Sequence, residues 1–534
     1  MDNHPQDATH VDYQIIFSNC RRILGKSAWG RVLAALEELS DPHVFPDIFQ
    51  SMGSVFDVPA YLSDLARLEW ESNRIKNSRT PPPQDLESAT VNPFLALLPV
   101  EWKNLPSLMN GCLDKELPEP ARVHVLIWRH PETGDLHIRE AEEIDLLALK
   151  ITVEKIDPRA AAAIGGIHTG AIRSALDRAI AQGILIAPES RIKRSVPSSI
   201  KQIEKIDSFL NAKTFTLQWH ITQTCDLHCK HCYDRSERDP MSRNTAMAIL
   251  DDFYSFCRSM NVKGQVTFTG GNPLLYPYFT DIYKAAWEHG FGVAILGNPT
   301  PIERIKSLVE IVKPLFFQIS MEGMAEYNDY IRGEGHFERS LAFLDQLRRL
   351  GIYTMVMLTL TRDNLDQVLP LGRILENHAD YFTFNRLVTV GEGAQLAMPT
   401  KNDFEDFLRK YEVEARNNPV LGLKDNLINI LREEKRIEPF GGCTGYGCGA
   451  AFNFVALLPD GEVHACRKFP SPIGNILQTH LLDIYHSGLA VKYRDGSDAC
   501  RDCNLYPVCR GCLAIAYSHD LDVFKDKDPF CFKR

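Results

Sequence analysis

The alternation of strand-like and helix-like segments between residues 217 and 387 constrains the fold of this chain most. Short apolar runs rich in β-branched and aromatic residues alternate with longer segments whose apolar residues recur every three or four positions. Strands joined by helical crossovers form a parallel sheet with right-handed connections. The expected strands are 217–222, 265–269, 291–296, 315–321, 352–360 and 381–387, and the expected helices are 244–260, 278–289, 302–312, 336–350 and 364–378.

Polar or glycine-rich residues stand at the carboxyl ends of most of these expected strands. A closing α/β barrel presents its functional groups at that edge, so we expect the site there. Three cysteines follow the first strand, Gly270-Gly271-Asn272-Pro273 the second and Asn298 the third, while Ser320 and Glu322 close the fourth and Asn385 and Arg386 the sixth.

The three cysteines that follow the first strand, Cys225, Cys229 and Cys232, have the spacing CxxxCxxC. Three thiolates so close in sequence suit a 4Fe–4S cluster in which one iron keeps no protein ligand. The alternative is a structural zinc site, in which His228 or His231 would be the fourth ligand. A zinc site would not require the polar turns of the other strands to gather at the same edge, and this alignment favours the iron–sulfur cluster.

Residues 217–387 resemble the radical S-adenosylmethionine (radical SAM) enzymes in several motifs beyond the cysteines. Gly270-Gly271-Asn272-Pro273 resembles the GGEP turn of that family, with Asn272 where glutamate is usual, and residues 320–323 resemble its SLDG motif. An amide oxygen can still accept a hydrogen bond from the SAM ammonium, without the charge assistance of a carboxylate. The resemblance implies a catalytic SAM-binding cluster on the three cysteines, and it implies SAM contacts from His231, Gly270, Gly271, Asn272, Pro273, Asn298, Ser320, Glu322 and Arg332.

Eight of the 14 cysteines lie from residue 443 onward: Cys443, Cys448, Cys466, Cys500, Cys503, Cys509, Cys512 and Cys531. They suffice for two four-cysteine iron–sulfur clusters, and zinc ribbons are the alternative. Their spacing resembles the SPASM domain, except that two residues instead of three separate Cys509 from Cys512. That resemblance implies one cluster on Cys443, Cys448, Cys466 and Cys512 and another on Cys500, Cys503, Cys509 and Cys531. The spacing alone leaves the partition open.

The N-terminal part differs in pattern from residues 217–387. Residues 12–75 have helical periodicity, 121–139 have the pattern of two strands, and helices are expected at 142–153, 159–164 and 169–182. Two strands and three helices are typical of a winged-helix module, but no basic face suited to DNA is present. Similar small domains precede the catalytic part of peptide-modifying radical SAM enzymes and capture the leader of a precursor peptide. A scaffold or dimerisation domain is the alternative.

We therefore expect an α/β protein with a partial (β/α)6 radical SAM barrel, an N-terminal helical plus winged-helix-like region and a C-terminal Cys-rich SPASM domain. The expected division is a helical N-terminal domain 1–115, a winged-helix-like peptide-recognition module 116–198, a linker 199–215, the radical SAM partial barrel 216–390, a helical bridge 391–442 and the SPASM domain 443–534.

Composition excludes several classes of protein. The formal net charge of −10 argues against binding to nucleic acid or to an anionic membrane. No signal peptide or membrane-spanning stretch is recognisable, so a cytoplasmic location is expected. In that compartment clustered cysteines bind metal instead of forming disulfides. Only Cys20, Cys112 and Cys257 stand alone, and Cys257 is expected to be a small core residue.

The resemblance implies an oxidoreductase that uses SAM and three 4Fe–4S clusters, one SAM-binding and two auxiliary. A 5′-deoxyadenosyl radical would abstract hydrogen from a ribosomally made precursor peptide, which is bound through its leader. A flavodoxin or ferredoxin would donate the electron. The sulfatase-maturing branch has a catalytic aspartate directly after the equivalent of Cys466, where this chain has Arg467.

Residues 217–234, with the stretches GGNPLLYP and ILGNP, resemble maturases of selenocysteine- or cysteine-containing peptides. A thioether or selenoether crosslink to carbon is the first expectation. C–C crosslinking or another radical modification of a peptide or protein is the alternative, and a non-catalytic Fe–S or zinc-binding protein is the alternative from another class.

Overall fold

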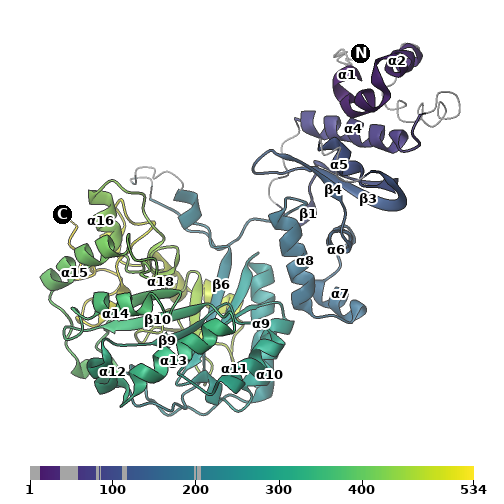
Figure 1. Cartoon of the computed structure of the whole chain (residues 1–534). Coiled ribbons are helices and arrows are strands. Elements are labelled where there is room, and N and C mark those ends of the chain that lie inside the picture. The colour runs from purple at the N-terminus through teal and green to yellow at the C-terminus, as the bar shows by residue number, and fades with distance from the viewer. Residues whose placement is uncertain are drawn as a thin grey trace. The chain divides into compact units, whose positions relative to one another are not determined.

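The structure is a computed structural model that describes residues 13–36, 58–79, 83, 86–110, 117–197, 200 and 206–533. The chain forms two compact units, Met1–Glu189 and Ser190–Arg534. The boundary after residue 189 therefore falls inside the expected winged-helix-like module (116–198). The expected linker (199–215) lies wholly within the second unit. Figure 1 shows the elements of each unit along the chain.

The second unit is built on a nine-stranded sheet with the order β11-β10-β9-β8-β7-β6-β12-β13-β14. All six strands expected between residues 217 and 387 are confirmed, and each pairs in parallel with its neighbour in sequence. They are β6 (Thr214–Thr222), β7 (Lys263–Gly270), β8 (Gly292–Leu296), β9 (Phe317–Ser320), β10 (Thr354–Leu360) and β11 (Tyr381–Arg386).

The five expected crossover helices are also confirmed: α9 (Arg243–Ser259), α10 (Phe279–Glu288), α11 (Ile302–Ile311), α13 (His336–Arg349) and α14 (Val368–Leu375). Helix α14 begins later than expected because the Asn364 side chain accepts a hydrogen bond from the Thr361 N–H and closes a turn. A helix of eight residues that the periodicity did not predict, α12 (Ala325–Arg332), carries Arg332 at its end. Large side chains such as Trp219 and Phe268 fill the core between sheet and helices.

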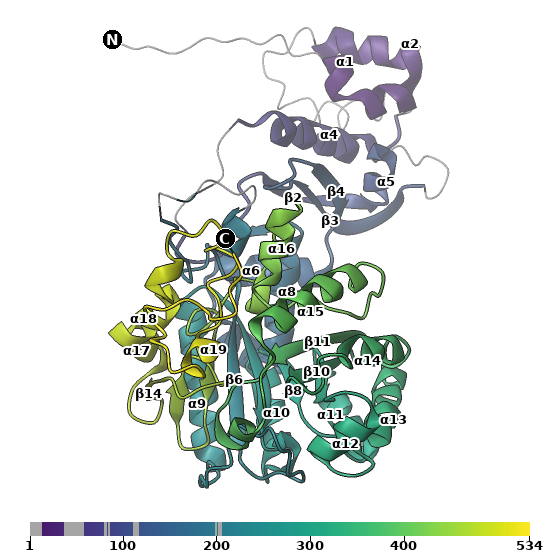
Figure 2. The ribbon, with the colours of Figure 1, turned by 90° about the vertical axis from the view of Figure 1, so that its left-hand side faces the viewer.

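The C-terminal part continues the same sheet. Strand β12 (Phe454–Leu457) pairs in parallel with β6, and β13 (Glu462–His464) and β14 (Pro472–Asn475) follow in antiparallel order. The β12–β13 hairpin leads to Cys466, and its addition to the parallel sheet was not visible in the sequence. Figure 2 shows α17 (Leu481–His486), α18 (Gly488–Asp495) and α19 (Leu513–Tyr517) on the β6 side, away from α12 and α13.

The expected helical bridge between the sheet and the cysteine-rich part consists of two helices, α15 (Lys401–Glu414) and α16 (Ile428–Glu434). They are separate because the intervening chain extends and Leu421 forms a parallel bridge with Phe382 of β11. The segment after this bridge brings Lys424 toward the carboxyl end of β11, where its ammonium donates a hydrogen bond to Asn385.

The first unit contains α1 (Tyr13–Ile16), α2 (Ser18–Leu36), α4 (Leu62–Asn77), α5 (Leu105–Met109) and a two-stranded ladder of β1 (Thr90–Val91) with β5 (Leu185–Ile186). Its antiparallel sheet has the order β2 (Leu95–Lys103), β3 (Glu119–Arg129), β4 (Leu136–Glu140), and the three expected helices follow as α6 (Glu143–Val153), α7 (Pro158–Gly165) and α8 (Thr169–Ala181).

Strand β2 departs from the expected helical domain 1–115. It pairs with β3 from Leu95 to Lys103, so one sheet crosses the expected boundary at residue 115. Residues 95–100 form a strand because they pair with β3, which comes later in the chain. This pairing cannot be read from residues 95–100 alone. The expected strands and helices of 121–182 are confirmed, and the winged-helix assignment remains a prediction. Cys112 lies outside the described residues.

No helix in the described part of the chain is both long enough and apolar enough to cross a membrane.

Candidate active site

One cavity of about 940 Å³ opens at the carboxyl ends of the parallel strands. Its wall includes two of the later cysteines, Cys443 and Cys466, together with the three cysteines of the CxxxCxxC loop. The predicted site residues that border it are Cys225, Cys229, His231, Cys232, Gly270, Gly271, Asn298, Ser320 and Arg332. The two groups of cysteines therefore face one shared space.

The CxxxCxxC loop follows β6 and leaves Cys225 exposed, with Cys229 and Cys232 half-buried. The Asn298 side-chain amide donates to the Cys225 sulfur at 3.6 Å, and the Arg332 guanidinium donates to the Cys229 sulfur at 3.6 Å. Burial raises the pKa of both thiols, and the positive charge of Arg332 partly offsets this at Cys229. These donors favour the thiolates, the form that binds iron.

The glycine turn after β7 holds the cysteine loop through its backbone. A Cβ on Gly270 would lie 2.1 Å from the carbonyl oxygen of Thr222, and one on Gly271 would lie 2.3 Å from that of Thr224. Gly270 also has a φ of 134°, which favours glycine. The Gly271 N–H donates to Thr222 at 2.9 Å, and the Asn272 N–H donates to Thr224 at 2.8 Å. This contact requires glycine at both positions.

Asn272 does not border the cavity. Its side chain is 1% exposed and donates to the Asp226 carboxylate at 3.1 Å, while Asn298 donates to the same oxygen at 2.6 Å. Pro273 is also buried and begins a short 3-10 turn, Pro273–Leu275. Sequence reasoning missed Asp226, although its place directly after Cys225 was a usable signal. The carboxylate of this region therefore stands on the cysteine loop and not on the glycine turn.

Glu322 is likewise buried away from the cavity, where it holds Arg332. One oxygen accepts from the Arg332 guanidinium at 2.9 and 2.6 Å, and the other accepts from the Thr359 N–H at 2.7 Å. Burial opposes ionisation, but His231, Arg332 and these hydrogen bonds lower the pKa of the Glu322 carboxyl. The His231 ring lies 3.4 Å from Glu322, and burial lowers the pKa of that imidazole. Glu322 thus fixes two side chains that do reach the cavity.

The eight C-terminal cysteines lie in two separate sets, which match the partition implied by the sequence resemblance. Cys443, Cys448, Cys466 and Cys512 surround a cavity of about 60 Å³, and Cys500, Cys503, Cys509 and Cys531 surround one of about 30 Å³. Within the described residues, no three Cys, His, Asp or Glu side chains lie close enough together to hold a single metal ion. Cys20 and Cys257 are buried in the cores of their units.

Two lysines that sequence reasoning missed, Lys424 and Lys468, border both the large cavity and the first cysteine set. The Lys424 ammonium donates to the Asn385 side chain at 2.5 Å, and burial lowers the pKa of this lysine. Lys424 lies in irregular chain between α15 and α16, where no motif marked it.

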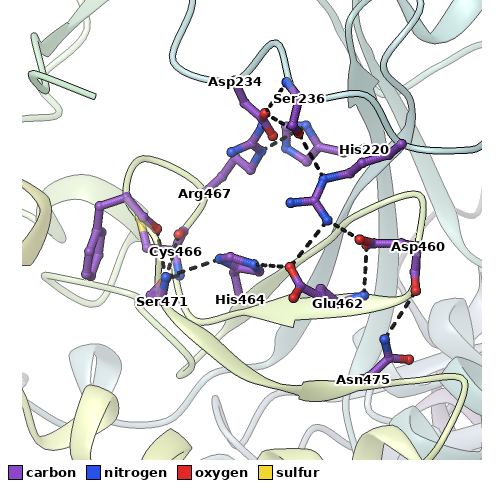
Figure 3. Close-up of polar contacts among 12 residues, drawn as sticks. His220, Asp234, Ser236, Asp460, Glu462, His464, Cys466, Arg467, Ser471 and Asn475 are labelled. Carbon is purple, nitrogen blue, oxygen red and sulfur yellow. Dashed lines mark hydrogen bonds and ion pairs between the residues drawn. The ribbon is translucent and has the colours of Figure 1, made fainter. Parts of the chain in front are cut away.

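Arg467 joins the two cysteine groups (Figure 3). It follows Cys466, and its guanidinium donates to Asp234 at 2.8 Å and to the His220 ring at 3.1 Å. It also lies over the Tyr233 ring, 4.1 Å from the centroid. Since Tyr233 and Asp234 directly follow Cys232, this contact fixes the end of the CxxxCxxC loop against the loop of Cys466.

Two family models match the chain. Residues 219–373 match the radical SAM superfamily, and residues 448–513 match an iron–sulfur cluster-binding domain, SPASM. The second match excludes Cys443 and Cys531, which lie outside its limits. Both matches lie within the second unit.

Among curated proteins, the chain is similar to an AdoMet-dependent heme synthase from Oleidesulfovibrio alaskensis, with 26% identity over 57% of this chain and 83% of the relative. It is also similar to the mycofactocin maturase MftC of Mycolicibacterium smegmatis, with 27% identity over 63% of this chain and 87% of the relative. The crystal structure of Streptococcus suis SuiB bound to precursor peptide SuiA has the same fold, with a TM-score of 0.50, 17% identity and coverage of 77% of this chain and 96% of SuiB.

Proposed function

We propose that this chain, which is a radical SAM enzyme with a SPASM domain, cross-links a ribosomally made peptide. The observation that carries the proposal is the shared cavity of about 940 Å³, which the CxxxCxxC cysteines border together with Cys443 and Cys466. A substrate segment in this space would lie between the SAM-binding cluster and the first auxiliary cluster.

The residues fit the cofactors of the family. Three cysteines at the cavity wall can hold a cluster with an open iron, and the glycine turn packs directly against their loop. When bound, SAM and the reduced cluster supply a 5′-deoxyadenosyl radical that removes hydrogen from an unactivated carbon. Arg332, Ser320 and His231 would orient SAM at the wall, while Asn272, Glu322 and Asp226 would hold these contacts in place from behind.

The peptide assignment depends on more than the two shared domains. The heme synthase and MftC are almost equally similar in sequence, so similarity in these domains does not choose between a tetrapyrrole and a peptide. The match to peptide-bound SuiB covers 77% of the chain, which is more than residues 190–534 alone make up. In the first unit, β2 and β4 are the outer strands of the described sheet. An extended leader can pair with such an edge.

The finer proposal is closure of a cysteine sulfur or selenocysteine selenium onto a peptide carbon, with a C–C crosslink as the competing product. Each closure removes two hydrogen atoms: one leaves with the deoxyadenosyl group, and the other leaves as a proton and an electron. A flavodoxin or ferredoxin would reduce the SAM-binding cluster. Arg467, at the position of the sulfatase-maturing aspartate, is held by Asp234 and offers no base for formylglycine formation.

The test is anaerobic. The full chain is reconstituted with iron and sulfide, given SAM and dithionite, and assayed for 5′-deoxyadenosine. Cys225→Ala should abolish the product, whereas Cys257→Ala, a buried cysteine of α9 outside every cysteine set, should not. Equal product from Cys225→Ala and the unmodified chain would reject the radical assignment.

The substrate is tested with candidate precursor peptides encoded beside the gene. Mass spectrometry should detect the loss of two hydrogen atoms per crosslink, and iodoacetamide then separates the two chemistries. A thioether leaves one alkylatable thiol fewer, and a C–C crosslink leaves the number unchanged. An unmodified peptide mass under conditions that release 5′-deoxyadenosine would reject peptide crosslinking.

A further inference from the structure

In the part of the chain that the structure describes, Arg510 is a buried cation without a hydrogen-bonding partner. Its side chain belongs to a residue that is 3% exposed, and none of its three guanidinium nitrogens has a partner among the described residues. The guanidinium lies over the Tyr506 ring, with its carbon 4.5 Å from the ring centroid. A buried charge without a partner lowers the free energy of unfolding by several kcal/mol, on the order of the loss when one partner of a buried ion pair is removed. Such a side chain is expected to have an anionic partner in the functional protein.

The position of Arg510 identifies that partner. It stands between Cys509 of one cysteine set and Cys512 of the other, and it borders the small cavity that Cys500, Cys503, Cys509 and Cys531 surround. Arg510 therefore stands in the chain between one cysteine of each set and borders the cavity of the second set.

A second arginine, Arg194, contacts the loop that carries Cys448. Arg194 donates to the backbone carbonyls of Tyr446 and Cys448 at 2.5 and 2.6 Å and stacks on the Phe452 ring at 3.7 Å. Its hydrogen bonds hold the loop of Cys448 in place. Within the described part of the chain Arg510 makes no comparable contact with the backbone, so its three guanidinium donors remain available to a ligand.

We propose that the Arg510 guanidinium donates hydrogen bonds to the auxiliary cluster of Cys500, Cys503, Cys509 and Cys531 and raises its reduction potential. The inference depends on the auxiliary clusters of the proposed function. A 4Fe–4S cluster with four thiolate ligands is anionic, and adding an electron to it costs less beside a buried cation. Hydrogen bonds to cluster sulfurs act in the same direction. Arg510 is thus a tuning residue and does not touch the substrate.

The electron released when the peptide crosslink closes gives this tuning a use. The substrate radical loses one proton and one electron as the new bond forms, and the electron needs an acceptor near the cavity. A raised reduction potential makes the auxiliary clusters better acceptors for this electron. Cys443 and Cys466 of the first set border the large cavity, and the set beside Arg510 borders a separate small one.

The experiment compares Arg510→Gln and Arg510→Lys with Arg501→Gln in the reconstituted full chain. Arg501 also neighbours the cysteines, but its side chain is 56% exposed and pairs with Asp498, so solvent screens its charge. Potentiometric titration followed by electron paramagnetic resonance measures the auxiliary clusters, together with iron and sulfide content. For Arg510→Gln we expect at least a tenfold lower reduced-to-oxidised ratio at a fixed potential, equivalent to about 59 mV for one electron. Arg501→Gln should leave the potential unchanged, and Arg510→Lys should lie between.

A full complement of iron with an unchanged potential in Arg510→Gln would overturn the proposal. If Arg510→Gln loses cluster iron, the free energy of unfolding of Arg510→Met is measured with and without clusters to separate the tuning role from a structural one. The proposal expects Arg510→Met to be at least as stable as the parent chain without clusters and less stable with them. Equal destabilisation in both states would show a purely structural arginine. Because potential and stability are measured without peptide, failure here is distinguishable from failure of the proposed function.

Discussion

Placing at position 272 the glutamate that is usual in the radical SAM GGEP turn should destabilise this protein. In the structure the Asn272 amide donates to Asp226 at 3.1 Å, and Asn298 donates to the same oxygen. Asn272→Glu replaces a donor with a second carboxylate and leaves two like charges side by side. The substitution also adds a methylene at a position that is 1% exposed.

The size of the effect follows from the geometry. Two unit charges about 4 Å apart repel by roughly 4 kcal/mol at an effective dielectric constant of about 20 and by roughly 1 kcal/mol in water. Asp226 is exposed to solvent on its outer side, so the lower part of this range applies, about 1 to 2 kcal/mol. Lowering the pH should reduce the penalty, because one of the two carboxyl groups then takes up a proton.

Urea unfolding of the full chain at pH 8 measures this effect in a double-mutant cycle. Asn272→Gln is the matched control, since it has the length of glutamate without the charge. We expect Asn272→Glu to lower the free energy of unfolding below that of Asn272→Gln, and we expect Asp226→Asn to recover the difference. Equal stability of the Glu and Gln variants, or no recovery with Asp226→Asn, would refute the pairing of positions 226 and 272.

Three further predictions concern neighbouring parts of the site. Gly271→Ala places a methyl group 2.3 Å from a backbone oxygen of the cysteine loop and should reduce iron binding at the CxxxCxxC site. Gly488→Ala, where an added Cβ would meet no other described part of the chain within 4 Å, should not, and iron and sulfide analysis of the reconstituted chain compares the two variants. Arg332→Met leaves the buried Glu322 without its cation and should lower the free energy of unfolding by about 3 to 5 kcal/mol, and adding Glu322→Gln should restore much of it; full destabilisation in the double variant would contradict the pairing. Burial lowers the pKa of His336 from 6.5 to about 4, so the stability that the neutral ring contributes is present above pH 6.5 and is lost as the pH falls toward 4. Unfolding at pH 7 and pH 5 should therefore show a larger loss in the parent chain than in His336→Gln, by about 1.4 kcal/mol per pH unit at most, and parallel losses would contradict the assignment.

Much of the second unit could be predicted from sequence because its signals are local. The strands from β6 to β11 and their crossover helices appear within a few residues of the expected positions, since apolar periodicity and turn residues act over one element at a time. The cysteine spacings are also local, and the first set of three lies at the expected edge of the sheet. Helix α12 is the exception, because two of its three buried residues, Asn328 and Arg332, are polar.

Only the tertiary structure decided which distant segments of the chain meet. The sequence placed eight cysteines without assigning partners, and folding brought Cys512 to Cys443 and Cys531 to Cys500 across stretches of unrelated chain. The carboxylate that faces Asn272 comes from the cysteine loop, and no rule of spacing connects the two positions. Arg510 is an ordinary basic residue in the sequence, and only the fold buries its guanidinium without a partner among the described residues. Periodicity reports which face of an element is buried, whereas charge compensation depends on which elements meet.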